Sequence, residues 1–350
     1  AGAVWFGVAD AAEGVAVRAA LQAKGLDGAR VLLMSGLLDE EADAIVEHRL
    51  TPIVWTVEQI ECVAAAARRR RAGPVSVHLA VETGMARQGA ALRDLGPVLD
   101  CLRHRGDEQS VTLEGVMTHF AAAEVAGSAL TREQRKRFEQ ALQRVNAVGL
   151  RPHLVHAGNS SMVDNDAAEG ALCWLREAAA SVGARPMTRA GIGLYGYCLP
   201  IDSGTAHAAH SLVRDRLQPV MTWKARVIAL RDVQAGETVG YNATFTAARP
   251  MRLALLPVGY ADGLRRELSS TNERAGGWVM LGGQRAAIIG RVSMNLTVVD
   301  VTEIPDAHVG DEAVVLGDGV TADDHARLAG TISYEILCGV RVRPRVLGAG

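Results

Sequence analysis

Lysine is scarce in this sequence. The 350 residues include three, Lys24, Lys136 and Lys224. Lys24 and Lys136 fall on polar faces of predicted helices, where a lysine side chain is usually solvated, and Lys224 falls in a predicted strand. A chemistry that depends on lysine therefore has few candidates among these residues.

Several other features are missing as well. The cysteines are odd in number and form no CxxC pair, so we expect neither a disulfide framework nor a metal site. No apolar run approaches the roughly 20 residues of a membrane span. The formal net charge of −2 gives no electrostatic reason to expect a nucleic acid or an anionic membrane as partner. A cytoplasmic protein is the resulting expectation. The cysteines are Cys62, Cys101, Cys173, Cys198 and Cys338.

Short apolar runs alternate with helical stretches rich in Ala, Leu and Arg over roughly the first 200 residues. The runs are almost entirely apolar, which is typical of parallel strands buried under helices. Alternating strands and helices predict an α/β barrel or a doubly wound sheet. The predicted strands are Trp5–Val8, Arg30–Met34, Pro52–Trp55, Val75–Val81, Leu113–Phe120, His153–Ala157 and Met187–Ile192, and the predicted helices are Ala11–Ala23, Glu40–His48, Thr56–Arg71, Leu92–Arg103 and Thr131–Val148.

The seven strands favour a TIM-like barrel from which the first βα unit is missing. A closed barrel of this kind needs eight strands, and an incomplete one would expose two strand edges, which natural proteins avoid. Because the sequence starts with Ala1 directly before a strand, we expect the missing unit to come first. The predicted barrel covers residues 1–213.

Residues 214–350 predict a second, mostly β domain. Strand-like runs are separated there by Gly-Glu, Pro-Asp and Gly-Asp turns. The predicted strands are Val220–Ala229, Met251–Leu256, Ala286–Ile289, Leu296–Val301 and Glu312–Leu316.

Polar or glycine-rich strings follow four successive barrel strands, at the strand ends where barrel enzymes place their active sites. They are ETGMAR at 82–87, MTHF at 117–120, HAGNSS at 156–161 and RAGIGLYG at 189–196. The β domain adds VGYNATF at 239–245, VGYADG at 258–263, GRVSM at 290–294 and ISYEILC at 332–338. These strings, in this order, resemble those of the fold-type III alanine racemases, which depend on pyridoxal 5′-phosphate (PLP). The resemblance covers nearly the whole chain.

The resemblance implies a homodimer in which each active site is shared between subunits. Two bases act on opposite faces of the α-carbon of alanine, while PLP supplies the electron sink. Tyr241, from the neighbouring subunit, is the expected base for L-alanine. The second base is the lysine that carries PLP, in a string like VKADAYGHG after the first barrel strand, and this string is absent here.

The same resemblance implies roles for other residues. Arg189 faces the pyridine nitrogen, and His119 stacks on the ring. His156 and Asn159 stand behind the residues that touch the cofactor. The expected substrate-side residues are Arg87, Met294 and Tyr260. Arg87 contacts the phenolic oxygen of the cofactor and the substrate carboxylate. Met294 contacts substrate through its backbone from the other subunit, and Tyr260 narrows the entry channel. The expected phosphate-binding residues are Ser160, Gly191, Ile192 and Tyr334.

Two positions depart from the family pattern. Ala80 replaces a lysine, often carbamylated, that supports Arg87. Either another anion such as Glu82 orients Arg87, or that arginine is less constrained. Asn295 replaces an Asp after Met294, which removes a negative charge near Tyr241. The segment Met162–Pro186 is longer than expected and has no assignment.

Three functions stay open. The first is an alanine racemase that supplies D-alanine for peptidoglycan, impaired in this chain because the PLP lysine is absent. The second is a non-catalytic PLP-binding remnant, of which Ala80 and Asn295 would be early signs. The third is a broad-specificity amino-acid racemase, for which Tyr260 would set the size of the pocket.

Overall fold

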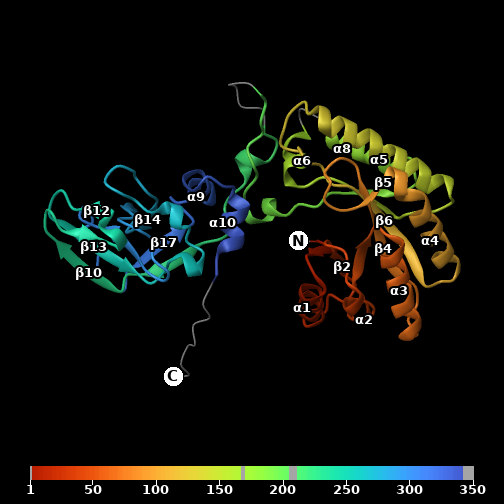
Figure 1. Ribbon diagram of the computed structural model, residues 1–350, viewed down its shortest axis with the longest axis horizontal. Helices are drawn as coiled ribbons and strands as arrows, with labels where there is room; N and C mark the ends of the chain where they lie inside the picture. The colour runs from red at the N-terminus through yellow and green to blue at the C-terminus, as the bar shows by residue number, and fades with distance from the viewer. Residues whose placement is uncertain (1, 167–169, 205–210, 342–350) are drawn as a thin grey trace. The chain divides into compact units, whose positions relative to one another are not determined.

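The computed structural model describes residues 2–166, 170–204 and 211–341 of the chain. Its contacts divide the chain into two units (Figure 1). The first unit is Ala1–Gly191 with Pro200–Asp215, and the second is Ile192–Leu199 with Arg216–Gly350. The division expected from the sequence, after residue 213, stays a prediction.

A parallel sheet forms the centre of the first unit, and it curls so that the helices lie on its outer side (Figure 1). The strands follow the order β1-β2-β3-β4-β6-β7-β8, and the short β5 pairs with β4. Within the described residues, β1 and β8 are the two edges of this sheet. The strand bounds are β1 Trp5–Val8, β2 Arg30–Leu33, β3 Thr51–Val54, β4 Val75–Glu82, β5 Ala90–Ala91, β6 Val111–Met117, β7 Leu154–His156 and β8 Arg185–Met187.

The helices of this unit begin at polar caps that the sequence supplies. Asp10 accepts a hydrogen bond from the Glu13 N–H at 2.9 Å, Thr56 accepts one from Gln59, and Ser128 accepts one from Thr131. Such side chains satisfy backbone donors that the first turn leaves unpaired. The helices are α1 Ala11–Gln22, α2 Ala42–Glu47, α3 Val57–Arg69, α4 Leu95–Asp107, α5 Ala129–Ala147, α6 Ser160–Asp164 and α8 Ala171–Ala180.

The second unit is built from antiparallel sheets. One sheet has the order β10-β13-β16, another has the order β15-β14-β17-β9, and β11 pairs with β12. Helices α9 (Ala322–Ala329) and α10 (Ser333–Gly339) follow the last strand. The strand bounds are β9 Trp223–Arg226, β10 Ala229–Val233, β11 Thr238–Val239, β12 Phe245–Thr246, β13 Met251–Leu256, β14 Trp278–Leu281, β15 Gln284–Ala287, β16 Thr297–Asp300 and β17 Glu312–Leu316.

The curled parallel sheet followed by a β domain confirms the predicted fold class. The last predicted barrel strand is wrong in position: β8 ends at Met187, and Ile192 begins a 3-10 helix, η3 (Ile192–Tyr195). Pairing with β7 stops at Met187, and the chain then turns. Helix α1 ends at Gln22, so Lys24 lies in the exposed turn after it instead of on a helix.

Two predictions in the second unit also need correction. The single strand expected at Val220–Ala229 is two strands in different sheets, because the backbone changes partners at Val227 and Ile228. The strand expected at Ala286–Ile289 begins and ends two residues earlier, as β15. It forms a hairpin with β14 across Gly282 and Gly283, which both have positive φ, as tight hairpin turns require. The unassigned Met162–Pro186 contains α8.

Helices α5 and α8 pack against the sheet through a large apolar core. Phe138 of α5 is fully buried, and its ring lies 6.2 Å from that of Trp174 on α8. No helix in the described ranges is long and apolar enough to cross a membrane.

Replacing Phe138 by alanine should destabilise the first unit by about 3–5 kcal/mol, because it removes a buried ring and leaves a cavity. Phe138→Leu, which fills more of that space, should cost less. Hydrogen-exchange mass spectrometry of peptides from α5 and β6 in increasing urea would measure both losses. A loss below about 1 kcal/mol for the alanine variant would contradict this packing.

Candidate active site

The strand-end residues of the first unit gather at one edge of the curled sheet. Parallel neighbours all end at the same edge, so the segments after β4, β6, β7 and β8 lie side by side. These segments carry Arg87, His119, the stretch 156–160 and Arg189. The unit therefore brings its own share of the predicted site together.

Arg189 is the centre of this group. Its backbone N–H donates to the Gly158 carbonyl at 3.0 Å, which ties the turn after β8 to the turn after β7. Its Nη2 donates to the Thr118 carbonyl at 2.8 Å and lies 3.2 Å from His119 Nδ1. Its Nη1 lies 3.0 Å from His156 Nδ1. A guanidinium can only donate hydrogen bonds, so both histidine nitrogens that face it must be unprotonated acceptors.

The electrostatics agree with these hydrogen bonds. Burial, followed by the charges of Arg189 and Arg87, lowers the pKa of His119 to about 4. Burial also holds the pKa of His156 well below its ordinary value, with His78 and Arg189 adding to the effect. Burial and the charge of Arg87 lower the pKa of Arg189 to about 10. At neutral pH Arg189 is charged and its histidine partners are neutral, so this site presents positive charge to a ligand.

The loop after β4 is folded around the Glu82 carboxylate. This group accepts hydrogen bonds from the backbone N–H groups of Gly84, Met85 and Arg87. Burial opposes the ionisation of Glu82, but these backbone donors outweigh it and lower its pKa. Gly89 closes the loop with φ +115, and a Cβ there would lie 2.6 Å from the Glu82 nitrogen.

Glu82 thus orients the backbone of Arg87 and not its guanidinium. The Arg87 side chain is exposed and has no hydrogen-bond or ion-pair partner within the described residues. Ala80 is 2% exposed and packs with Leu32, Ile53 and Met117. The support that a charged residue would give Arg87 from position 80 is replaced by apolar packing.

The segment after β7 provides polar groups beside Arg189. The Asn159 side chain caps α6 by accepting from the Met162 N–H at 3.1 Å. The Gly191 N–H donates to Ser160 Oγ at 3.3 Å, so these two predicted phosphate-binding residues are neighbours. Backbone N–H groups and a hydroxyl of this kind suit an anion.

The other two predicted phosphate-binding residues belong to the second unit. Ile192 and Tyr334 pack in one apolar cluster with Tyr197 and Ile336. The boundary between the units falls between Gly191 and Ile192. A single phosphate site made of all four residues stays a prediction.

Tyr241, Tyr260 and Met294 lie on three neighbouring segments of the second unit. The Tyr260 N–H donates to the Ser293 carbonyl at 3.0 Å, and the Ala261 N–H donates to the Met294 carbonyl at 2.9 Å. A Cβ at Gly240 would lie 3.2 Å from the Arg291 nitrogen, in the same 290–294 segment. All three side chains are exposed, at 68% for Tyr241, 45% for Tyr260 and 56% for Met294.

The turn that carries Tyr241 is strained. Asn242 and Ala243, directly after it, have φ values of +62 and +49. Left-handed backbone is uncommon for residues other than glycine, and it clusters at functional sites. The meeting of Tyr241 with Arg189 and His119 stays a prediction.

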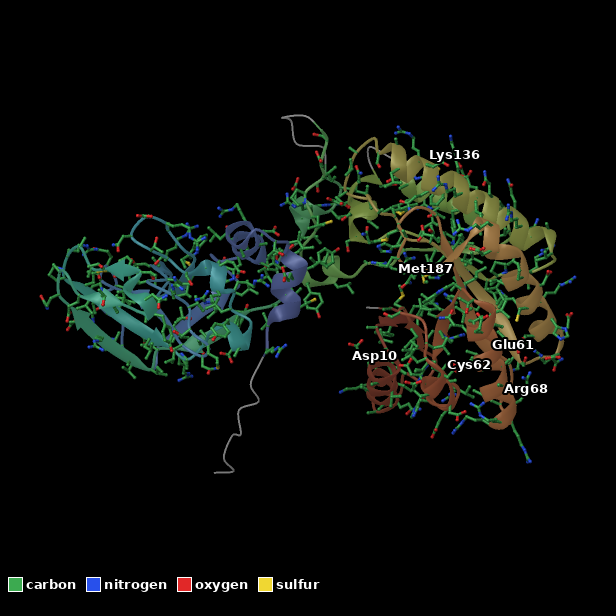
Figure 2. All side chains as sticks on the ribbon, viewed as in Figure 1. Asp10, Glu61, Cys62, Arg68, Lys136 and Met187 are labelled. Atoms are coloured by element: carbon green, nitrogen blue, oxygen red, sulfur yellow. The ribbon has the colours of Figure 1, made fainter. Side chains whose placement is uncertain are left out.

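None of the three lysines belongs to the group around Arg189. Lys24 is exposed after α1, and Lys136 is exposed on the outer side of α5 (Figure 2). Lys224 of β9 forms an ion pair with Glu312 at 3.1 Å. Among the described residues, no cluster of three or more His, Cys, Asp or Glu side chains could hold a metal ion.

Sequence reasoning did not identify His78, which lies behind His156. Its Nδ1 is 2.7 Å from His156 Nε2, and it is fully buried in β4. The available sign was an ionisable residue inside the mostly apolar run Val75–Val81. A polar side chain at such a position needs a buried partner.

Two family models match the chain. The model "Alanine racemase, N-terminal domain" matches residues 1–199, and "Alanine racemase, C-terminal domain" matches residues 220–347. The alanine racemase of Sorangium cellulosum is 36% identical over 324 residues, which cover 89% of this chain and 77% of that protein.

Solved structures agree with this match. The alanine racemase from Streptomyces coelicolor has a TM-score of 0.81 at 29% identity and covers 99% of this chain and 85% of its own. The alanine racemase from Bartonella henselae, solved with covalently bound pyridoxal phosphate, has a TM-score of 0.71 at 24% identity. It covers 98% of this chain and 84% of its own, and this likeness shows the fold alone.

Acid should destabilise the first unit, because its site histidines are neutral in the folded state. The pKa values of His119 and His78 are lowered to about 4 and about 3. Above the unfolded pKa of about 6.5 these histidines leave the free energy of unfolding at its full value. As pH falls from there toward the folded pKa values, the free energy of unfolding decreases by about 1.4 kcal/mol per pH unit for each histidine.

The measurement is the urea concentration at which peptides from β6 and β7 lose half of their hydrogen-exchange protection after equilibration at pH 7.5, 6.0 or 5.0. The labelling pulse is given at the same pH for all three samples. His119→Gln should flatten the pH dependence, and His153→Gln, which changes an exposed histidine of the same unit, is the control. Equal slopes for wild type and His119→Gln would contradict the assignment of a neutral buried His119.

Proposed function

This chain belongs to the alanine racemase family, and on that premise we propose that it interconverts L-alanine and D-alanine with PLP as cofactor. The observation that carries the proposal is Arg189, whose guanidinium is held between two histidine acceptors and a backbone carbonyl. Nothing in that set can take a proton from Arg189 at neutral pH.

The residues around Arg189 fit PLP. The cofactor has a phosphate dianion and a pyridine nitrogen that can accept a hydrogen bond. Ser160 and Gly191 offer a hydroxyl and a backbone N–H for the phosphate. His119, neutral beside Arg189, offers an uncharged ring for stacking. When bound, PLP supplies an electron sink for negative charge at the α-carbon of alanine.

Arg189 would hold the pyridine nitrogen as an acceptor. The guanidinium remains protonated, because its pKa of about 10 is still well above neutral. A nitrogen that receives a hydrogen bond without receiving the proton withdraws fewer electrons. This restraint favours return of the α-proton over side reactions such as transamination.

Tyr241 is the proposed base on the L-alanine face, and it would act in the active site of a partner subunit. Its exposure and its strained turn support a role that another copy of the chain completes. Tyr260 and Met294 lie on adjoining segments and would accompany it. Arg87, exposed on its ordered loop, would bind the substrate carboxylate.

The second base is the proposed point of impairment. In this family it is the lysine that carries PLP, and the three lysines of these 350 residues are accounted for elsewhere. The enzyme with that lysine would work in the cytoplasm and supply D-alanine for peptidoglycan. The intact acceptor set around Arg189 favours this function over that of a non-catalytic remnant.

The 350-residue chain should bind PLP without a covalent bond. Titration should quench protein fluorescence saturably, and Arg189→Gln should weaken binding about tenfold, because it removes charged donors. The control Arg93→Gln changes an arginine whose side chain is 85% exposed and should bind normally. After borohydride reduction and dialysis, no stoichiometric PLP should remain. PLP fixed in full yield to Lys24, Lys136 or Lys224 would overturn this expectation.

In a chain extended to include the anchoring lysine, Tyr241→Phe should separate the two bases. Exchange of the α-proton of L-alanine in D2O should fall at least about a hundredfold, and exchange from D-alanine should persist, because the bases serve opposite faces. Proton NMR of each enantiomer measures the two rates. Arg249→Gln, which changes an exposed residue of the second unit outside the proposed site, is the control and should spare both exchanges. An equal loss of exchange from both enantiomers would contradict the assignment of Tyr241 to one face.

A separate assay of substrate range tests the alternative function. Equal racemisation of alanine, serine, lysine and arginine would favour a broad-specificity racemase.

A further inference from the structure

His78 and Glu114 lie behind Arg189, in the interior of the first unit, and the proposed function gives them no role. His78 Nδ1 is 2.7 Å from His156 Nε2, and its Nε2 is 4.0 Å from Glu114 Oε2. Glu114 in turn forms an ion pair with Arg30. A line of polar groups thus runs from β2 and β6, through β4 and β7, to the site.

A bulge in β6 gives Glu114 this direction. Val77 of β4 pairs with Leu113 and the next residue, His78, pairs with Gly115, so Glu114 is one extra residue on β6. A bulge of this kind re-aims a side chain. Gly115 makes room for the imidazole, since a Cβ there would lie 2.7 Å from the His78 ring.

The hydrogen bonds from Arg189 to His156 and from His156 to His78 can run in one direction only. Arg189 donates to His156 Nδ1, so neutral His156 carries its proton on Nε2. That proton is donated to His78 Nδ1, so neutral His78 carries its own proton on Nε2. This nitrogen has no hydrogen-bond partner and faces the Glu114 carboxylate at 4.0 Å, where the negative charge favours a proton. The reverse order would place an N–H of His156 against the guanidinium, with donor facing donor.

The surrounding charges favour the same order. Burial, with Arg30 and Arg189 contributing, lowers the pKa of His78 to about 3, so the imidazole is neutral. Arg30 also lies 5.0 Å over the Trp5 ring, and that ring is 5.0 Å from His78. A carboxylate at one end and a guanidinium at the other polarise the two imidazoles in one sense.

We propose that His78 and Glu114 are positioning residues for Arg189: they fix the tautomers of both imidazoles and thereby keep an acceptor facing the guanidinium. This inference rests on the proposed function only in what Arg189 is positioned for. The tautomers themselves are a property of the chain without cofactor.

The test is the nitrogen NMR spectrum of the chain labelled with ¹⁵N-histidine at pH 7. Signals are assigned from the His78→Asn and His156→Asn variants. Both histidines should be neutral with the proton on Nε2. A proton on Nδ1 of either residue, or a charged imidazole, would overturn the proposal.

Glu114→Gln tests the far end of the line. The carboxylate charge 4.0 Å from His78 Nε2 is then lost, so the preference for a proton on that nitrogen weakens and Arg189 alone favours the order. Protonation of His156 at Nδ1 should become detectable, and PLP should bind about tenfold more weakly. The matched control is Glu47→Gln, which removes a different ion pair with an arginine, Arg70 at 2.7 Å. It should change neither result, and an unchanged His156 tautomer in Glu114→Gln would overturn the proposal.

Two substitutions of His78 distinguish a positioning role of this residue from a packing role. In His78→Asn the amide oxygen lies near the place of Nδ1 and can still accept from His156, whereas His78→Leu offers no acceptor. PLP affinity should therefore be closer to wild type for asparagine than for leucine, and the reverse order would count against the proposal.

A second variant covers the case in which Glu114→Gln fails to fold. Arg30→Met leaves Glu114 in place and removes its ion-pair partner, so His78 and His156 should keep their protons on Nε2 in the same spectrum at pH 7. Arg70→Met is the control, and a proton on Nδ1 of either histidine in Arg30→Met would overturn the proposal. If the tautomers are as stated but PLP does not bind, the proposed function fails and this inference stands.

Discussion

The hydrogen-bond donors of Arg189 must each meet an acceptor, and this constraint arranges the interior of the first unit. A guanidinium has no acceptor atom and keeps its protons. It therefore requires acceptor nitrogens on His119 and His156, and His156 in turn lies against His78. Burial makes this arrangement possible at neutral pH, because it removes the option of charging the imidazoles. The charged guanidinium of Arg189 is therefore held in place by the neutral imidazoles of His119 and His156.

The architecture could be predicted because it depends on local patterns. Apolar runs marked the strands, and the strand–helix alternation indicated a curled parallel sheet. The failures lie where pairing is decided at long range. Val220–Ala229 has one continuous strand pattern, yet its halves join different sheets. The strand at Met187–Ile192 was placed too late, because the pattern does not reveal that Arg189 binds the Gly158 carbonyl and turns the chain.

The site residues also fall into those that local sequence predicts and those that depend on long-range pairing. Arg189 and His119 were predicted from strings at strand ends, and the structure joins them directly. His78 and Glu114 were missed, since their relation depends on a one-residue bulge that shifts the register between β4 and β6. No periodicity announces such a bulge. The strings around Tyr241 predict a role, but its exposed position becomes informative only beside the segments that carry Tyr260 and Met294.

Ala80 shows how one substitution redistributes order in the loop that carries Arg87. An ionised side chain at this buried position would need a charged or hydrogen-bonded partner, and Ala80 has apolar neighbours instead. Glu82 then fixes the backbone of the loop while the Arg87 guanidinium has no partner among the described residues. Ordering an arginine side chain costs up to about 2 kcal/mol. In the proposed enzyme that cost falls on substrate binding, so Ala80 would weaken affinity for the carboxylate while the placement of Arg189 is unaffected.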